Sequence, residues 1–471
     1  MTHRYLNRSA TELAAMIRRG EATSAEIVDA HIRHIEAVNP ALNAVVKDRF
    51  EQARAEAQEA DRRAAKSKDD LGIFHGVPFT VKESFALEGM PNSGGLVARK
   101  STLAGKDAPT VARLRKTGAI PLGVTNVSEL CMWMESNNRV YGRTNNAYDQ
   151  RCIAGGSSGG EGAIVGAGGS PFGLGSDIGG SIRMPAFFNG VFGHKPSGGL
   201  IENEGQYPTA SGAALRYMTP GPLARRAVDL APVVRALAGH DSIGDPSAIR
   251  IADLTVTVIE GNGAIPVRDD LLAALHTAAR ALAARGARVR TARVSTLSRS
   301  LEIWSSMLQA AGGPSFREML GNGSPFSTAR EIVRWSLGRS PHTFPALALA
   351  LVEQVPELLP NQRDRFLELG KALSAEMQHL IGPRGVILYP PYPTPAPRHY
   401  KPLFPPWNWV YTAIWNVLEL PVTQAPLGFD AEGLPLGLQI VGPPDQDAVP
   451  IAVAIELERA FGGWTPPKPA R

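Results

Sequence analysis

Two glycine-rich stretches hold the residues of this chain that are best suited to chemistry. They read GGSSGG at 155–160 and GLGSDIGGS at 173–181. Glycines let a backbone approach a ligand closely, and successive exposed N–H groups form a nest for negative charge. That charge could belong to a phosphate or to a transition-state oxyanion. Neither stretch fits the phosphate-binding patterns G-x-x-x-x-G-K-[ST] or G-x-G-x-x-G, so the oxyanion is the better interpretation.

An oxyanion hole needs a nucleophile and a base beside it. Ser181, directly after two glycines, is well placed as the nucleophile, but a serine hydroxyl is inert at neutral pH until a base takes its proton. Lys82 closes the apolar run HGVPFTVK and could be that base, because burial lowers the pKa of a lysine. Pairing of Lys82 with the adjacent Glu83 is the structural alternative, and spacing alone does not decide between the two.

The first stretch offers a competing nucleophile. GGSSG at 155–159 matches the G-x-S-x-G elbow, which would make Ser157 the nucleophile with an acid and a histidine downstream. That motif belongs on a strand-to-helix turn, whereas the preceding YDQRCIA is a weak strand at best. His194 and His399 lie downstream in no recognisable triad setting. The pattern therefore favours a lysine base over a histidine base.

A parallel sheet is expected to position these residues. The runs 77–81 and 119–124 are typical of buried strands, and 108–116 between them is typical of a helix. Such a β-α-β unit requires parallel strands. The pattern recurs with strands at 252–260 and 287–294 around a helix at 269–286. Further strands are expected at 385–390 and 434–442. Helices are expected within 10–66, including one capped by Ser24, and at 448–460. We expect one large α/β domain with peripheral helices over 1–471.

Composition excludes several classes of protein. The 471 residues include 49 Lys and Arg against 44 Asp and Glu, and this thin excess without a dense basic tract argues against nucleic acid as a partner. The two cysteines cannot build a disulfide framework or a C-x-x-C metal site. His31 and His34 have no third ligand in view, so we assign them to a solvated helix face and expect no metal. The N-terminus lacks the apolar core of a secretory signal, and no apolar run approaches the about 20 residues of a spanning helix, which predicts a soluble cytoplasmic protein.

Several longer motifs resemble the amidase signature family. They are HGVPFTVKES at 75–84, GGSSGGEGAIVGAGGSPFGLGSDIGGSIRMPA at 155–186, GHKPSGG at 193–199, GPLAR at 221–225 and GLPLGLQIVGP at 433–443. The similarity covers almost the whole chain, and the motifs at 131–146 and 340–354 are most similar to the fatty-acid amide hydrolase 2 group. The resemblance implies a single domain whose central mixed, twisted β-sheet is covered by helices on both faces, with 71–225 as the signature core.

The resemblance also implies a Ser-Ser-Lys triad that cleaves amides through an acyl-enzyme. Ser181 falls on the family's nucleophile, Ser157 on its bridging serine and Lys82 on its base. The peptide bond between Gly156 and Ser157 is cis in the family. The reaction that this triad implies acts on a small amide and needs no metal and no organic cofactor.

Further positions match the family's substrate-binding residues. The oxyanion donors fall on the backbone N–H groups of Ile178, Gly179, Gly180 and Ser181. Cys131 falls in the acyl pocket, where its main chain meets the substrate, and the resemblance places Met132 and Met134 nearby.

Three other positions match residues that support the loops. These are Ser158, Asp177 and Arg183, and an ion pair between the last two is expected because arginine can fork across a carboxylate. Glu83 departs from the family, since many relatives carry aspartate there.

Residues 300–420 are expected to shape the substrate pocket. They contain the apolar helix 344–352 and a set of tryptophans, although core packing is the more frequent role of any single tryptophan. In fatty-acid amide hydrolases the equivalent of 335–360 forms a membrane-facing cap, which implies weak peripheral membrane contact here. Dimers are common in the family, so a homodimer is among the expected assemblies. As a cluster, the tryptophans favour apolar acyl or aryl amides, fatty-acid amides included; they are Trp304, Trp335, Trp407, Trp409 and Trp415.

Two other functions stay open at this point. The A subunit of a glutamine-dependent tRNA amidotransferase has a related sequence, but it needs a polar amino-acid pocket, which Cys131, Met132 and Met134 would not supply. A catalytically silent binding protein on the same scaffold often lacks a member of the triad, whereas all three members are present here.

Overall fold

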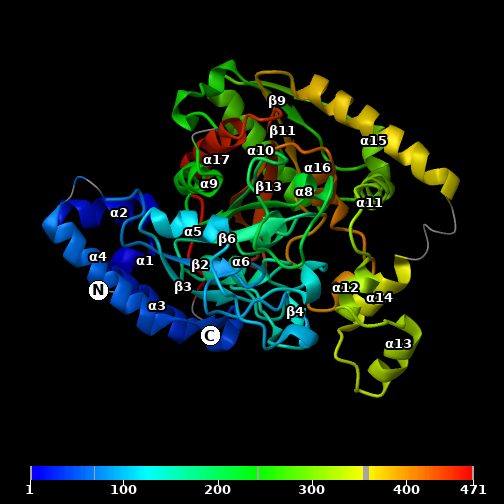
Figure 1. The fold of residues 1–471 in the computed structure, drawn as a ribbon. Coiled ribbons are helices and arrows are strands. Elements are labelled where there is room, and N and C mark those ends of the chain that lie inside the picture. Colours follow the sequence, from blue (N-terminus) through cyan, green and yellow to red (C-terminus); the bar gives the residue numbers. More distant parts are fainter. Residues whose placement is uncertain (1–2, 68, 70, 241–242, 354–359, 469–471) are drawn as a thin grey trace.

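One mixed β-sheet runs through both halves of the chain (Figure 1). The computed structural model describes residues 3–67, 69, 71–240, 243–353 and 360–468. The strands of the sheet are β1 (Val45–Asp48), β2 (Pro78–Lys82), β3 (Ile120–Thr125), β6 (Phe172–Asp177), β7 (Phe192–Lys195), β8 (Thr219–Ala224), β9 (Thr255–Val258), β10 (Arg288–Thr291), β11 (Gly385–Tyr389), β12 (Val422–Phe429) and β13 (Pro435–Val441). Within the described ranges these eleven strands follow the order β1-β3-β2-β6-β8-β7-β12-β13-β11-β9-β10. A separate short ladder pairs β4 (Asn137–Asn138) with β5 (Gly142–Arg143).

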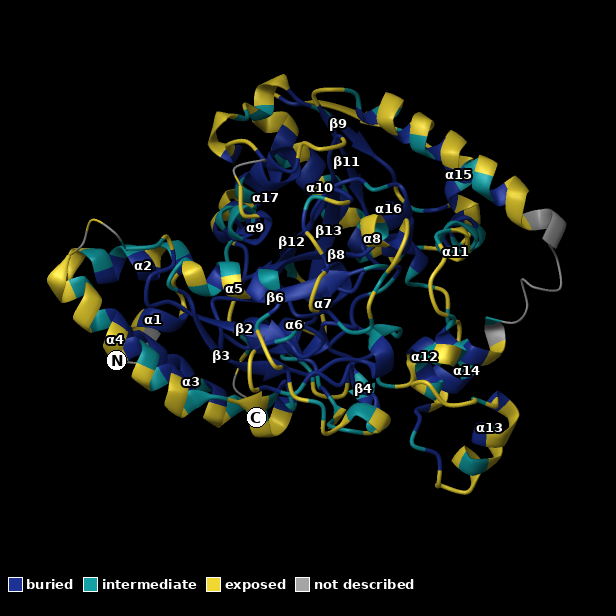
Figure 2. Cartoon of the chain, in the orientation of Figure 1, coloured by how far each residue is buried: buried dark blue, intermediate teal, exposed yellow. Residues whose placement is uncertain are grey.

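Seventeen α-helices of the described residues surround the sheet. They are α1 (His3–Leu6), α2 (Ala10–Arg19), α3 (Ser24–Leu42), α4 (Phe50–Lys66), α5 (Pro109–Lys116), α6 (Gly159–Gly166), α7 (Arg183–Phe188), α8 (Ala214–Tyr217), α9 (Leu230–Ala238), α10 (Asp269–Ala284), α11 (Ser300–Ala310), α12 (Phe316–Gly321), α13 (Thr328–Ser336), α14 (Phe344–Val352), α15 (Pro360–Ile381), α16 (Val410–Val417) and α17 (Ala448–Phe461). Figure 2 shows that the inner helices are largely buried, whereas α4, α13 and α15 expose much of their surface.

Two apolar cores lie on opposite faces of the sheet. Phe79 and Val81 of β2 pack in one core with residues of α5, α9, α10 and α17. Ile120 and Leu122 of β3 pack in another core with residues of α4 and α6. Because successive side chains of a strand point to opposite faces, this division means that helices cover both sides. The predicted fold class, a large mixed sheet covered by helices, is confirmed.

The predicted parallel unit is present in the first half of the sheet. β2 is parallel to both β3 and β6, and α5 connects β2 to β3 as expected. The second predicted unit is also present, because β9 is parallel to β10 and α10 lies between them in the chain. Antiparallel pairs from β6 to β11 join these two parallel parts. The carboxyl ends of β2 and β6 therefore lie side by side, near the middle of the N-terminal part of the sheet.

Two local predictions in the N-terminal helices were wrong. Ser24 does not cap its helix: Thr23 is the N-cap because it forms a reciprocal capping box with Glu26, and Ser24 is the first helical residue. His31 is fully buried rather than on a solvated face, and its Nδ1 lies 2.8 Å from the carbonyl oxygen of Ile27. Burial lowers the pKa of His31 to about 3, so the ring is neutral.

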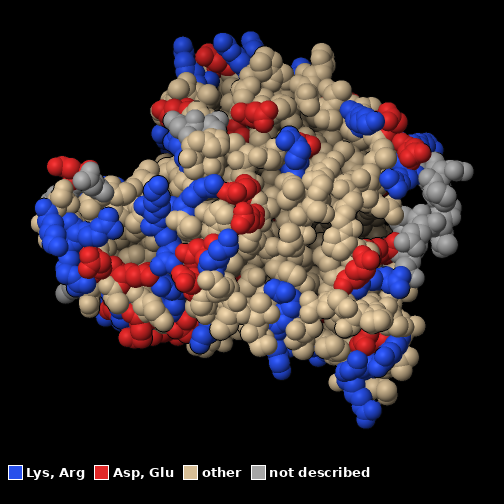
Figure 3. All heavy atoms as spheres, in the orientation of Figure 1, with Lys and Arg blue, Asp and Glu red and all other residues tan. Residues whose placement is uncertain are grey.

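Three features of the structure concern the predicted contact with membranes: the length of its helices, the apolar helix α14 and the distribution of surface charge. In the part of the chain that the structure describes, no helix is long and apolar enough to span a lipid bilayer. Helix α14 has the bounds predicted for the apolar helix, but 354–359 of the predicted membrane-facing segment lie outside the described residues. On the face shown in Figure 3, basic and acidic side chains lie interspersed, and an area without them lies to the right of the centre.

Candidate active site

Lys82 lies at the carboxyl end of β2, next to β6. Its side chain is fully buried, and Nζ donates hydrogen bonds to Ser157 Oγ at 2.7 Å and to Ser176 Oγ at 3.0 Å. Burial lowers the pKa of Lys82 because an ammonium group loses its hydration there, although the nearby Asp177 and Glu161 act in the opposite direction. The surroundings thus favour a neutral amine, which is able to accept a proton.

Ser157 and Ser181 lie on two loops that are joined through the backbone. Ser157 precedes α6 and follows a cis peptide bond from Gly156, as the resemblance implied. A Cβ at Gly156 would lie 2.4 Å from the carbonyl oxygen of Trp133, so this close approach requires glycine. Ser181 is 7% exposed, and its carbonyl oxygen accepts a hydrogen bond from the N–H of Ser158 at 3.2 Å. A backbone hydrogen bond therefore joins the loops of Ser157 and Ser181, and Lys82 at the end of β2 contacts Ser157.

A buried ion pair holds the loop that carries Ser181. Arg183 donates from Nε and Nη2 to the two carboxylate oxygens of Asp177 at 3.0 and 2.8 Å. It also donates to Asn416 Oδ1 at 2.6 Å and to Gln439 Oε1 at 2.8 Å. Burial alone would raise the pKa of Asp177, but the guanidinium beside it holds that pKa well below its usual range. The expected ion pair is present, and loss of either partner would leave a buried charge at a cost of about 3–5 kcal/mol.

One of the four expected oxyanion donors is already in use. The N–H of Gly180 donates to Asp177 Oδ1 at 2.7 Å. Gly180 was expected to donate to the oxyanion. A residue has a single backbone N–H, and that of Gly180 is bound to a carboxylate, so it is not free for a substrate. The N–H groups of Ile178, Gly179 and Ser181 remain as candidate donors to a negative charge.

Cys131 lies in a loop of unusual backbone conformation. The φ angles of Leu130 and Cys131 are +53° and +58°, a left-handed region that costs a non-glycine residue about 1–3 kcal/mol. The Leu130 N–H donates to the carbonyl oxygen of Gly94 at 2.8 Å, which holds this loop in place. The Cys131 thiol lies beside Ser157 and Ser84, and burial raises its pKa. The structure thus brings the side chain of Cys131 next to the Lys82–Ser157 pair.

Met132 and Met134 contact different parts of the molecule. Met134 is 2% exposed and belongs to an apolar cluster with Met184 and Tyr392, whose hydroxyl lies 3.6 Å from the Met134 sulfur. Met132 packs instead against a cluster that includes Phe316 of α12. The two methionines therefore extend from the Cys131 loop toward two separate apolar regions.

The tryptophans do not form the single cluster that the sequence predicted. Trp304 and Trp409 meet edge to face with ring centroids 4.7 Å apart, beside Gly179. Trp415 of α16 is fully buried in the same apolar cluster as that pair, whereas Trp335 and Trp407 are 36% and 47% exposed. Of these five tryptophans, the structure places Trp304 and Trp409 beside the candidate oxyanion loop.

Comparison with known proteins decides the family of this chain. Residues 26–449 match the protein-family model described as Amidase. The chain belongs to the amidase family. It is 46% identical to fatty-acid amide hydrolase 2-A of Danio rerio, over 99% of this chain and 91% of that protein. It is 43% identical to fatty-acid amide hydrolase 2 of Homo sapiens, over 98% and 90%.

A solved structure supports the same assignment. The structure of 6-aminohexanoate cyclic dimer hydrolase complexed with substrate matches with a TM-score of 0.77 and 27% identity, over 97% of each chain. The resemblance to amidase signature enzymes, and within them to fatty-acid amide hydrolases, is thereby confirmed.

In this amidase the two histidines of the competing elbow interpretation have other partners. His194 Nε2 lies 3.0 Å from Asp447 Oδ1, and His399 Nδ1 lies 2.6 Å from Glu135 Oε1. Lysine rather than histidine contacts the hydroxyl of Ser157. The geometry therefore favours the lysine base.

Glu83 does not pair with the adjacent lysine of the amidase site. Its carboxylate accepts hydrogen bonds from the N–H groups of Ser93 and Gly94 at 2.7 and 2.9 Å and from the Tyr141 hydroxyl at 2.7 Å. Burial raises the pKa of Glu83, while these donors oppose that effect. Because the Gly94 carbonyl in turn binds Leu130, Glu83 supports the loop on the far side of the site.

Two residues of this amidase site were not predicted. Ser176, at the end of β6, accepts the second hydrogen bond of Lys82. Glu161 on α6 accepts the hydroxyls of Thr80 and Thr125 at 2.6 and 2.9 Å, and burial raises its pKa to about 8. The sequence contains a feature that could have pointed to each of them. Ser176 lies in the second glycine-rich stretch, and Glu161 is the one charged residue in 155–176.

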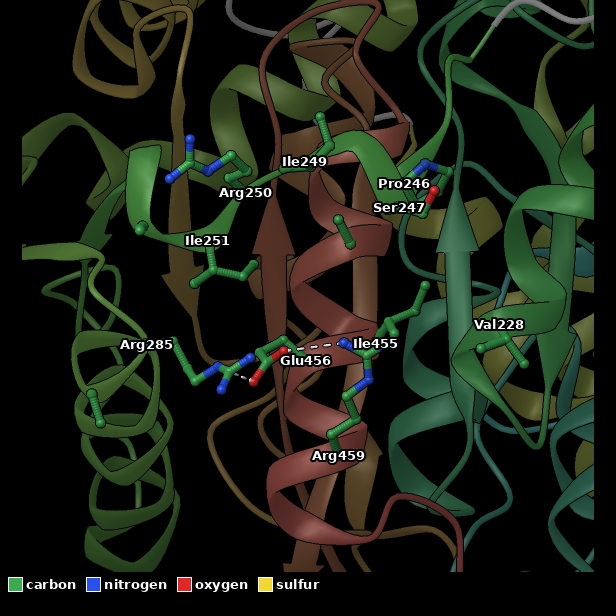
Figure 4. Close-up of a pocket in the computed structure, with 13 residues that line it drawn as sticks. Val228, Pro246, Ser247, Ile249, Arg250, Ile251, Arg285, Ile455, Glu456 and Arg459 are labelled. Carbon is green, nitrogen blue, oxygen red and sulfur yellow. Dashed lines mark hydrogen bonds and ion pairs between the residues drawn. The ribbon is translucent and has the colours of Figure 1, made fainter.

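A cavity of about 590 Å³ is lined by residues other than those of the candidate site (Figure 4). It lies between α10, α17 and the chain that follows α9, and its lining combines aliphatic side chains with arginines and Glu456. Glu456 is held there by Arg285 at 2.8 Å and by Arg459 at 3.4 Å. The carboxylate of Glu456 in this cavity is therefore already bound by two arginines.

Proposed function

We propose that this protein hydrolyses carboxylic amides through an acyl-enzyme on Ser181. The observation that carries the proposal is the 2.7 Å hydrogen bond from Lys82 Nζ to Ser157 Oγ at a fully buried amine. Burial favours the neutral form of that amine, which is the form that acts as a base. Relatives that are named as amide hydrolases support the same reaction.

The proposed reaction passes one proton along three side chains. Neutral Lys82 accepts the proton of Ser157, Ser157 accepts the proton of Ser181, and Ser181 Oγ attacks the amide carbonyl. The carbonyl oxygen gains negative charge, which the N–H groups of Ile178, Gly179 and Ser181 stabilise. The proton then returns through Ser157 to the leaving nitrogen, which departs as an amine. Water repeats the attack on the ester, releases the carboxylic acid and restores Ser181.

The proposed substrates are amides with an apolar acyl or aryl group. The Trp304–Trp409 pair lies beside Gly179, and Trp409 also packs against the apolar cluster of Met134 and Met184. Burying apolar surface against such side chains contributes about 25 cal/mol per Å². The relatives named as fatty-acid amide hydrolases are in keeping with this class.

Hydrolysis rates over a series of acyl groups test the substrate class. We expect kcat/KM for long-chain or arylacyl amides to exceed that for acetamide by about tenfold or more, because each buried methylene contributes about 0.8 kcal/mol. Glutamine belongs in the series because an amidotransferase A subunit would hydrolyse it. Rates that are highest for glutamine or acetamide would contradict the proposal, and an absence of hydrolysis throughout would support a silent scaffold.

Exposed apolar side chains on α13 and α14 predict weak attachment to a lipid surface. Val333 is 58% exposed on α13, and Leu351 is 53% exposed on α14. In liposome flotation we expect a minor fraction of the protein to float, because such side chains can enter the headgroup boundary. Val333→Ser combined with Leu351→Ser should lower that fraction, whereas Leu103→Ser, at a position 61% exposed elsewhere in the chain, should not. A wild type that never floats with the vesicles would contradict the membrane contact.

A further inference from the structure

We propose that Trp304 positions the oxyanion hole of this enzyme by holding the backbone carbonyl of Ile178. The inference rests on the proposed function, because it concerns the N–H groups that stabilise the tetrahedral oxyanion. Trp304 lies on α11, 126 residues after Ile178, and its indole Nε1 donates to the Ile178 carbonyl oxygen at 3.0 Å. It is a positioning residue, since it acts on the reaction through another residue's backbone.

A hydrogen bond to a peptide carbonyl determines where the next N–H points. In a trans peptide unit the C=O and the following N–H lie in one plane and point in opposite directions. The carbonyl of Ile178 shares its peptide unit with the N–H of Gly179. By holding that carbonyl on one side, the indole directs the Gly179 N–H to the other side of the loop.

The neighbouring peptide units are held in the same manner. Asn416 Nδ2 donates to the carbonyl oxygen of Asp177 at 2.9 Å, and the N–H of Met184 donates to the carbonyl oxygen of Gly180 at 2.8 Å. Each bond directs the N–H of the next residue along the chain. Each of the three candidate oxyanion N–H groups therefore belongs to a peptide unit whose carbonyl oxygen already accepts a hydrogen bond. Two of these hydrogen bonds come from side chains of α11 and α16, which lie outside the signature core.

Trp304 is fixed firmly enough to orient the loop. Its side chain is 9% exposed, and its ring meets Trp409 edge to face at 4.7 Å. A Cβ built on Gly179 would lie 3.6 Å from Trp409 and 3.7 Å from Trp304, so both rings lie on the side of the loop toward which a side chain at Gly179 would point. A hydrogen bond to the carbonyl also polarises the peptide unit and strengthens its N–H as a donor, by about 10–30% per bond.

Trp304→Phe tests the inference, because it removes the indole N–H and retains an aromatic ring. We expect kcat for amide hydrolysis to fall about 10- to 100-fold with little change in KM, since the lost alignment matters only when the oxyanion forms. The affinity for an alkyl boronic acid, which forms a tetrahedral adduct with the nucleophile, should fall by the same factor. Trp409→Phe is the matched control: it alters the same ring pair without removing the donor to Ile178, and should change KM more than boronic-acid affinity.

The inference and the proposed function fail in different ways. A wild type that neither hydrolyses apolar amides nor binds the boronic acid would overturn the proposed function. A wild type that does both, beside a Trp304→Phe variant whose kcat and boronic-acid affinity stay within about twofold, would overturn the positioning role alone. If Trp304→Phe does not fold, Trp304→Gln and Trp304→Ala replace it: glutamine keeps an N–H donor and should retain more boronic-acid affinity than alanine. Equal losses in those two variants would also overturn the inference.

Discussion

Replacing Ser181 by alanine is expected to lower kcat for amide hydrolysis by a factor of about 10⁴ or more. The hydroxyl is the proposed nucleophile, and no acyl-enzyme forms without it. A fluorophosphonate probe, which reacts covalently with an activated serine, should label the wild type and leave Ser181→Ala unlabelled. Steady-state hydrolysis and the mass of the intact protein after exposure to the probe measure the two effects on one preparation.

Ser158→Ala is the matched control for this experiment. Ser158 lies in the other serine loop and reaches Ser181 through its backbone N–H, which the substitution leaves in place. This variant should therefore keep the label. A Ser181→Ala protein that still reacts, with the probe mapped to Ser157, would contradict the proposal and restore the elbow interpretation.

Lys82→Met is expected to lower kcat by about 10²–10⁴ and to remove the acidic limb of the pH profile. Burial lowers the pKa of Lys82 from its ordinary value of 10.5, so the amine is neutral above that lowered pKa. As the pH falls through the lowered pKa, the amine binds a proton and wild-type activity falls by about tenfold per pH unit. Methionine has a similar length and no titrating group, so the residual rate of the variant, measured over the same pH range, should lack this limb.

Lys195 provides the matched control for the pH experiment. It is also a fully buried lysine, at the end of β7, and its Nζ donates to the carbonyl oxygen of Pro196 at 2.8 Å. Burial lowers its pKa to about 7, so it too could produce an acidic limb. We expect Lys195→Met to keep the wild-type limb. If Lys195→Met loses the limb while Lys82→Met keeps it, Lys82 is not the base.

The pattern of short runs between turn residues predicted six of the strands. β2, β3, β9, β11 and β13 lie within or close to the predicted ranges as apolar or mixed runs. β10 also lies within its predicted range, 287–294, although its residues are mostly polar and exposed. β6 and β8 escaped prediction because FGLGSD and TPGPLA contain glycine and proline, which by themselves indicate loops. These segments are strands because they pair with each other along their whole length, and β6 also pairs with β2. Pairing between distant segments has no local signal.

The lack of a local signal for long-range contacts also explains which parts of the candidate site were predicted. Family motifs led to Lys82, Ser157 and Ser181, since those motifs are continuous in sequence. They did not lead to the donor that Trp304 supplies or to the use of the Gly180 N–H by a carboxylate. The first depends on packing of α11 against the oxyanion loop, and composition alone made all the tryptophans equivalent. The second is a contact three residues apart within the loop, whose backbone conformation the motif does not reveal.

The ion pair of Arg183 has a consequence for how the protein is made. Beyond its carboxylate partner, the guanidinium donates to Thr412, Asn416 and Gln439, which are 229, 233 and 256 residues further along. A ribosome synthesises the cation long before these acceptors. A fragment that ends at residue 225 would therefore keep the ion pair with Asp177 but lose these three acceptors, and the nascent chain completes the hydrogen bonds of Arg183 only after Gln439 has been synthesised.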